Sequence, residues 1–251
     1  MLENSAMKEN FSPAEWQARV ELAAIYRLID HFRYTDTIYN HISLRLDHDD
    51  TILINPFGLL YNEIKASNLV KITVEGEILH DPTGLGINRA GYVIHGAIHS
   101  ARPDVTCVIH THSRAGIAVS AQEEGLLPIS QHAALMYGRI GYHDFEGIAV
   151  NLDEQQRLVR DLGEYYFMIL RNHGLLTAGR SPGEALQNMI NLERACDAQV
   201  AALAGGVPVR RISEEALLAT RKAVEQYGND FSTDWAAMLR LAHQVAPGFD
   251  I

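Results

Sequence analysis

An apolar run that ends in two histidines constrains this chain more than any other segment. Residues 105–109 read Val-Thr-Cys-Val-Ile, and His110, Thr111 and His112 follow directly. The β-branched run predicts a strand, and side chains two positions apart on a strand lie on the same face. We therefore expect His110 and His112 to emerge together, where two neutral imidazoles can chelate one divalent ion.

A second apolar run ends in a similar way. Residues 166–170, Tyr-Phe-Met-Ile-Leu, precede Arg171, Asn172, His173 and Gly174. We expect His173 to complete a three-histidine metal centre with one coordination position open to a substrate. Gly174 is expected to adopt a positive φ that aims His173 back toward the first pair. A His-x-His pair by itself is a weak indication of a metal site, so the second histidine-ended run carries much of this argument.

Length and composition favour one large globular domain. The chain has 251 residues, 47% of them hydrophobic and 21% charged, which suffices for a large buried core. The formal net charge of −10 argues against nucleic acid or an anionic membrane as the main partner. No stretch approaches the roughly 18 apolar residues of a membrane-spanning helix, and the N-terminus lacks the pattern of a signal peptide. Cys107 and Cys196 both fall in apolar elements, which favours free thiols and a cytoplasmic location.

Patterns along the chain predict helices that alternate with strands. Ser-Pro-Ala-Glu at 12–15 and Ser-Pro-Gly-Glu at 181–184 are capping boxes with proline at the first helical position. This alternation favours an α/β sheet covered by helices, in a single domain over 1–251. Residues 207–251 are expected to form a helical extension. Besides the run before His110, strands are expected at 39–46, 51–55, 69–74, 78–79 and 166–171, and helices at 16–32, 91–101, 114–123, 153–163 and 181–204.

Several motifs together resemble the class II aldolase/adducin family. They are Ile94-His95, Ala101-Arg102-Pro103-Asp104, His110-Thr111-His112 and Arg171-Asn172-His173-Gly174, preceded by Asn40-His41-Ile42-Ser43 and Ile54-Asn55-Pro56-Phe57-Gly58. The resemblance covers a core of about 14–205 and implies an α/β/α sandwich around a central mixed, largely antiparallel sheet. It also implies a homotetramer with active sites at subunit boundaries. In the sugar-phosphate aldolases of this family three histidines hold zinc, and the matching positions here are His110, His112 and His173.

Other positions depart from the aldolase pattern. The aldolases carry Ser-Ser-Glu, with a glutamate that serves as acid/base, where this chain has Arg89-Ala90-Gly91. Glycine at position 91 offers neither a proton nor a metal ligand, and the two phosphate-binding serines are missing as well. The Gly-Asn of the phosphate cradle falls near Asn40-His41, and Phe57-Gly58 replaces a Thr-Gly turn. The tyrosine that a neighbouring subunit contributes in the aldolases falls on His132.

We therefore expect a metal-dependent lyase that cleaves a C–C bond next to a carbonyl, by aldol cleavage or decarboxylation. Its small-molecule substrate would be non-phosphorylated or carboxylated. One divalent ion, zinc before manganese or iron, would stabilise the enolate. His132 is the candidate proton donor, because an imidazole titrates near neutral pH. Candidates for substrate binding are Asn40, His41, Gly58 and Arg89, of which Arg89 suits a carboxylate. Structural alternatives stay open: Arg89 as a solvated loop arginine, His132 as a packed or interface histidine, and His41 as a strand-end histidine bonded to the backbone.

Two other functions fit the same residues. A non-catalytic, adducin-like protein-interaction module would keep the fold and bind a protein partner. A sugar-phosphate aldolase or epimerase would need a relocated acid/base. The intact triad favours the lyase over the module, and the missing phosphate ligands disfavour the sugar-phosphate enzyme. His95 is expected on the same helix face as Gly91, as support for the metal site or as a core residue, and His143 is expected in a loop.

Overall fold

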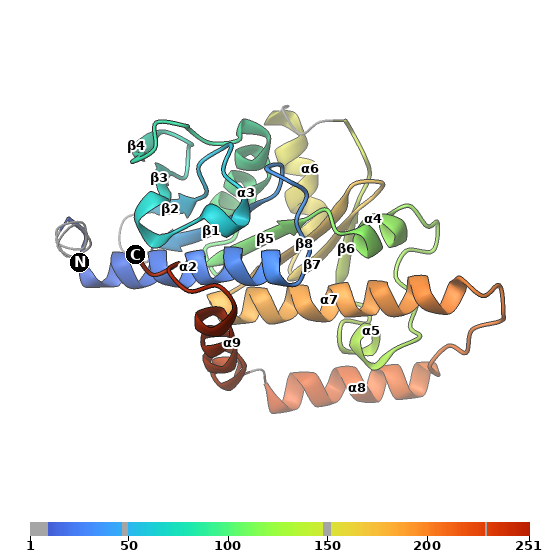
Figure 1. The fold of residues 1–251 in the computed structure, drawn as a ribbon. Coiled ribbons are helices and arrows are strands. Elements are labelled where there is room, and N and C mark those ends of the chain that lie inside the picture. The colour runs from blue at the N-terminus through green and yellow to red at the C-terminus, as the bar shows by residue number, and fades with distance from the viewer. Residues whose placement is uncertain (1–9, 47–49, 148–151, 229) are drawn as a thin grey trace.

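The computed structural model of the chain describes residues 10–46, 50–147, 152–228 and 230–251 (Figure 1). Its centre is one eight-stranded sheet with the order β4-β3-β2-β1-β5-β8-β7-β6. Neighbouring strands in the described chain are antiparallel except for β6 and β7, which are parallel. The predicted mixed, largely antiparallel sheet is therefore confirmed. The strands are β1 (His41–Leu46), β2 (Thr51–Ile54), β3 (Val70–Thr73), β4 (Ile78–His80), β5 (Cys107–Thr111), β6 (Ile140–His143), β7 (Phe167–Leu170) and β8 (Gly174–Gly179).

Helices cover both faces of this sheet, which gives the predicted α/β/α arrangement (Figure 1). On one face α3 (Arg89–Ala101) packs against α6 (Leu152–Leu162), and on the other α2 (Pro13–His31) packs beside α7 (Pro182–Leu203). None of the described helices combines the length and the apolar character that spanning a bilayer requires. The other helices are α4 (Arg114–Ser120), α5 (Gln131–Leu135), α8 (Glu214–Tyr227) and α9 (Ser232–Val245), with short 3₁₀ turns at Tyr61–Glu63 and Ala66–Asn68.

The central strand β5 shows how the two layers fix the register of the sheet. Val108 packs into the cluster formed with α3 and α6, whereas Cys107 and Ile109 pack into the cluster formed with α2 and α7. All five residues of β5 are buried, as expected for a strand covered on both faces. A shift by one residue would exchange the two faces, so the alternation places His110 on the α3 side and Thr111 on the α7 side.

The two long helices begin where their capping sequences predict. The Ser12 hydroxyl accepts the backbone N–H of Glu15 at 3.1 Å, and the Ser181 hydroxyl accepts that of Glu184 at 3.1 Å. Proline occupies the first helical position in both helices, where its missing N–H costs nothing. Each cap removes an unsatisfied donor at a helix end and contributes about 1 kcal/mol.

Some elements differ from the sequence prediction. The two early hairpins, β1–β2 and β3–β4, are present, and the turn between the first pair lies partly outside the described residues. Strands β6 and β8 and the short helix α5 were missed. Both strands contain glycine, and β8 reads Gly-Leu-Leu-Thr-Ala-Gly, a composition with little intrinsic strand preference. Pairing with β5 and β7 on its two sides makes that segment a strand.

Candidate metal centre

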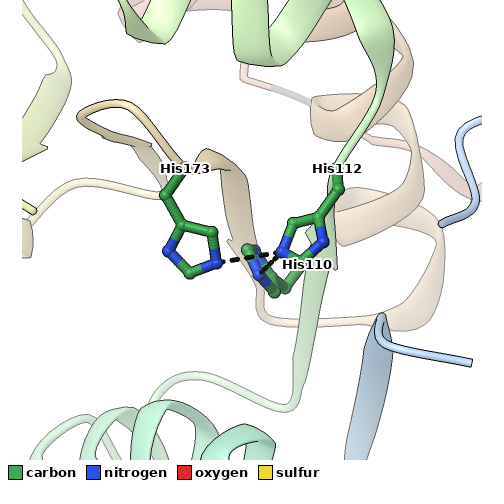
Figure 2. Close-up of side chains that lie close together, drawn as sticks. All are labelled: His110, His112 and His173. Carbon is green, nitrogen blue, oxygen red and sulfur yellow. Dashed lines mark hydrogen bonds between the residues drawn. The ribbon is translucent and has the colours of Figure 1, made fainter. Parts of the chain in front are cut away.

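Three histidines from two separate segments face one another at one edge of the molecule's core (Figure 2). His110 lies in β5 and His112 directly follows it, while His173 lies in the turn between β7 and β8. The Nε2 atom of His112 is 2.8 Å from Nε2 of His110 and 2.9 Å from Nε2 of His173. Within the described residues, this is the one group of three or more potential ligands that converge closely enough for a metal ion.

In His110 and His112, the Nδ1 atom that points away from the centre lies next to a hydrogen-bond acceptor. Nδ1 of His110 lies 2.9 Å from the Leu175 carbonyl oxygen, and Nδ1 of His112 lies 3.1 Å from a carboxylate oxygen of Asp36. A proton on each Nδ1 leaves the Nε2 lone pair free to point into the centre, which is the tautomer that a metal requires. Asp36 is itself held in place, because its N–H donates to Oδ1 of Asn40 at 2.5 Å.

Two of the three imidazoles of this centre, those of His110 and His173, are held neutral. Burial, followed by the neighbouring imidazoles, lowers the pKa of His173 to about 4 and places that of His110 well below its ordinary value. Neutral nitrogens aimed at one point suit a divalent cation and do not suit an anion. Tetrahedral ligands at zinc distances would lie roughly 3.3 Å apart, so these side chains need to separate by only about half an ångström to bind an ion. The residues therefore fit a metal ion held by three histidines.

Gly174 supports this arrangement for a reason other than the expected one. Its φ is not positive, and the left-handed residue of the turn is Asn172, with φ of 56°. The expectation for Gly174 was therefore wrong. A Cβ on Gly174 would lie 2.3 Å from the Thr111 carbonyl oxygen and 3.1 Å from a ring carbon of His112. Glycine is needed at this position because β8 passes so close to the backbone between His110 and His112.

A buried carboxyl group supports the same strand from the opposite face. Glu193 of α7 is fully buried and accepts hydrogen bonds from the Thr111 hydroxyl at 2.7 Å and the Ser113 hydroxyl at 2.5 Å. Burial raises the pKa of Glu193 to about 7. These two residues flank His112, so the contact fixes the backbone that carries this ligand. The sequence analysis missed Glu193, although an acidic residue on the buried face of a long helix was a usable signal.

A line of buried polar groups extends from the triad toward α3. The ring of His41 lies 5.0 Å from that of His110, and its Nδ1 is 2.8 Å from Nε2 of His95. His95 continues the line through its Nδ1 to the Ser43 hydroxyl at 2.5 Å. Burial lowers the pKa of His41 to about 3, so this imidazole is neutral at physiological pH. His95 thus has a polar partner on each side and is a supporting residue.

The ring of His41 occupies the space next to Gly91, which has no side chain. A Cβ built on Gly91 would lie 2.4 Å from Cδ2 and 2.8 Å from Nε2 of the His41 ring. An acidic residue at position 91 and the present position of His41 are therefore mutually exclusive. The imidazole of His41 fills the space that a side chain at position 91 would need.

The other candidate residues lie in different surroundings. Asn40 is buried and uses Oδ1 to bind the Asp36 N–H, while its Nδ2 has no partner among the described residues. Gly58 has φ of 105° in the loop after β2, and Arg89 is exposed at the first position of α3. His132 lies on α5, in the wall of a cavity that contains none of the three converging histidines. The structure therefore does not bring His132 to the triad of its own chain.

His143 also differs from its expected position. It belongs to β6 and is buried, with Nδ1 2.8 Å from an Asp161 carboxylate oxygen and Nε2 3.5 Å from one of Glu154. Two carboxylates on opposite sides of one ring hold that ring in place, and they do not converge on a metal position. The expectation of a loop residue is therefore wrong.

Comparisons with known proteins agree with this architecture. Residues 20–200 match the family described as Class II Aldolase and Adducin N-terminal domain. The chain therefore belongs to the class II aldolase and adducin family.

Individual relatives represent both parts of that family name. An aldolase II superfamily protein from Pseudomonas syringae shares 48% identity and a TM-score of 0.92, over 97% of this chain and 99% of that one. An L-fuculose 1-phosphate aldolase from Glaciozyma antarctica shares 25% identity and a TM-score of 0.82, over 94% and 93%. Alpha-adducin of Rattus norvegicus is 46% identical over 197 residues, which are 77% of this chain and 27% of the adducin.

Proposed function

We propose that this protein is a metal-dependent lyase that cleaves a C–C bond next to a carbonyl group, by aldol cleavage or decarboxylation. The observation that carries the proposal is the convergence of three histidines, in which Nε2 of His112 is 2.8 Å from Nε2 of His110 and 2.9 Å from Nε2 of His173. His110, His112 and His173 would hold one divalent ion, zinc before manganese or iron. When bound, such an ion supplies Lewis acidity that stabilises negative charge on a carbonyl-derived oxygen.

The residues around the triad support a substrate that differs from a sugar phosphate. His41 presents a neutral imidazole where a Gly91 side chain would project, and it can donate to or accept from a substrate oxygen. The free Nδ2 of Asn40 is a second donor in the same region. Arg89, exposed at the start of α3, can pair with a carboxylate. Gly58 keeps its own loop clear of side-chain atoms. In this proposal these groups bind and orient a non-phosphorylated or carboxylated small molecule.

The proposal includes an oligomer. Because His132 lies away from the triad of its own chain, it can donate a proton at a metal centre only if a neighbouring subunit brings that centre to it. A homotetramer with active sites at subunit boundaries would satisfy this requirement.

Metal analysis of the purified protein tests the proposal directly. The wild-type protein should contain about one transition-metal ion per chain, His110→Ala should lose it, and the exposed His31→Ala should keep it. Screening keto acids and hydroxy-carbonyl compounds for carbon dioxide release or aldol cleavage then identifies the reaction. Metal-free wild-type protein that stays metal-free after reconstitution would refute the proposal.

A second function has a specific observation in its favour. The chain is 46% identical to the alpha-adducin segment but 25% identical to the L-fuculose 1-phosphate aldolase, and it lacks a carboxylate at position 91. An adducin-like protein-interaction module would account for both facts. The same metal analysis separates the two functions, because a module of this kind has no need of an occupied triad.

A further inference from the structure

One face of α7 is polar although it does not face open solvent. Glu184, Gln187, Asn188 and Asn191 follow the i, i+3, i+4, i+7 spacing of a single helix face, and all four line a cavity of about 370 Å³. The opposite side of α7 packs on β8 and β5. This volume lies in the range of small-molecule sites, which is roughly 300–1,000 Å³.

The part of the chain that follows the family domain forms one wall of the cavity. The family match ends at residue 200, and α8 and α9 come after it. Helix α8 packs on α5, and α9 packs on α2 and α7. Both helices lie on the side of α7 that faces away from the sheet (Figure 1). Val224, Phe231 and Asp234 from the C-terminal part of the chain, and Phe167 from β7, also line the cavity.

Two guanidinium groups, of Arg139 and Arg180, and two carboxylates, of Glu184 and Asp234, line the cavity. Glu184 is fully used by Arg180, whose N–H, Nε and guanidinium nitrogen donate to its two carboxylate oxygens. Arg139 also lines the cavity and is half-buried, and it forms no ion pair with any residue that the structure describes. Its guanidinium donates to the Leu135 carbonyl, and its Nε is buried without an acceptor among those residues.

An unpaired, half-buried guanidinium is costly unless an anion approaches it. Burial, followed by the nearby Arg221, lowers the pKa of Arg139, while Glu225 acts in the opposite direction with a smaller effect. The amide groups of Gln187, Asn188 and Asn191 each carry donors and an acceptor, which is what hydroxyl groups need. Asn188 is buried and already spends one donor on the Ala178 carbonyl, so it is a fixed part of the wall.

We propose that this cavity is a second ligand site, separate from the metal centre of its own chain, that binds a small polyhydroxylated carboxylate. The ligand carboxylate meets Arg139, its hydroxyl groups bond to the amides of α7, and its C–H surface packs against Phe167 and Phe231. None of these residues belongs to the triad of the same chain, although His132, the proton donor proposed for a neighbouring subunit's metal centre, lines the same cavity. The site gives the two C-terminal helices a role in recognition.

Isothermal titration with three probes tests the proposal on the full chain. D-Gluconate has both features of the expected ligand, D-glucitol lacks its carboxylate, and propionate lacks its hydroxyl groups. Gluconate should bind at least tenfold more tightly than either of the others, because each lacks one set of contacts. Absence of gluconate binding up to about 10 mM would overturn the proposal.

Variants locate the binding within the molecule. Arg139→Gln should weaken gluconate binding at least tenfold, and Asn191→Ala should weaken it about fivefold. Arg240→Gln is the matched control, because Arg240 also donates to the carbonyl four residues earlier but lies exposed on α9. Circular dichroism checks that each variant is folded. Wild-type affinity for gluconate in both Arg139→Gln and Asn191→Ala would overturn the assignment.

A titration of His110→Ala separates this site from the metal centre. Gluconate can also bind metal ions, and binding of that kind should disappear when the triad is broken. Retention of gluconate binding in His110→Ala supports the cavity, whereas its loss assigns the binding to the metal centre and overturns the proposal. A metal-free protein that still binds gluconate would refute the lyase and leave the second site intact.

Discussion

Replacement of Gly174 by alanine should weaken metal binding by moving two ligands apart. The added Cβ would lie 2.3 Å from the Thr111 carbonyl oxygen, and ordinary van der Waals contact begins near 3.4 Å. The backbone must therefore move by about 1 Å where β8 passes β5. Thr111 lies between His110 and His112, and Gly174 follows His173, so the movement acts directly on the separation of the ligands.

The expected magnitude follows from the tolerance of metal geometry. Ligand distances in metal sites vary by about 0.2 Å, and a displacement near 1 Å exceeds this several times. We expect Gly174→Ala to lower metal affinity by about 10- to 100-fold, the range found when the support of a ligand is lost. Overpacking should also lower the free energy of unfolding by about 1–3 kcal/mol, which leaves the protein folded. Gly174→Val, with a larger side chain, should have a stronger effect.

Competition with a chromophoric chelator measures the affinity, and thermal unfolding of the metal-free protein measures the stability. Gly205→Ala is the control, because a Cβ there meets nothing closer than 3.9 Å and its φ is not positive. Wild-type metal affinity in Gly174→Ala would refute the argument that close backbone passage sets the geometry of the triad. An equal loss of affinity in Gly205→Ala would show that the effect is not local.

Two further predictions concern the surroundings of the triad. Asp36→Asn should lower metal affinity about tenfold, because it removes the negative charge that faces Nδ1 of His112, and chelator competition should show no change in the exposed control Asp50→Asn. Burial and Arg45 lower the pKa of His99 to about 3. Below about pH 6.5, His99 therefore binds a proton in the unfolded chain but not in the folded protein. The free energy of unfolding should consequently fall as the pH falls from 6.5 toward 3. Urea unfolding at several pH values measures how steeply this free energy changes with pH. His99→Asn should reduce the slope by about one proton, or about 1.4 kcal/mol per pH unit, whereas the exposed control His31→Asn should not. Identical slopes in His99→Asn and the wild type would contradict the assignment.

Local sequence rules predicted the elements that have strong local signals. Capping boxes placed the starts of α2 and α7, and the apolar run before His110 placed β5. Strand β8 could not be predicted in this way, because glycine and alanine are depleted in strands and its two neighbouring strands decide the outcome.

The candidate site likewise has one part that a local pattern predicts and another part that depends on distant segments. His110 and His112 are two residues apart, so strand periodicity alone put them on one face. The partners that orient them come from distant segments: Asp36 from the loop after α2, Leu175 from β8 and Glu193 from α7. The close approach of His41 to Gly91 likewise joins β1 to α3. No single-segment pattern contains such information, because each contact depends on how complete elements pack.

The strand order has a consequence for how the protein matures during synthesis. Strand β5, which carries His110, pairs with β1 on one side and with β8 on the other. Its partner β8 comes much later in the chain and begins at Gly174, directly after His173. A nascent chain that ends before residue 173 lacks one ligand, the backbone acceptor of His110 and one edge of the central strand. Such long-range pairing forms late in folding. Any metal would thus be captured only after most of the chain has left the ribosome, and truncated translation products would be free of it.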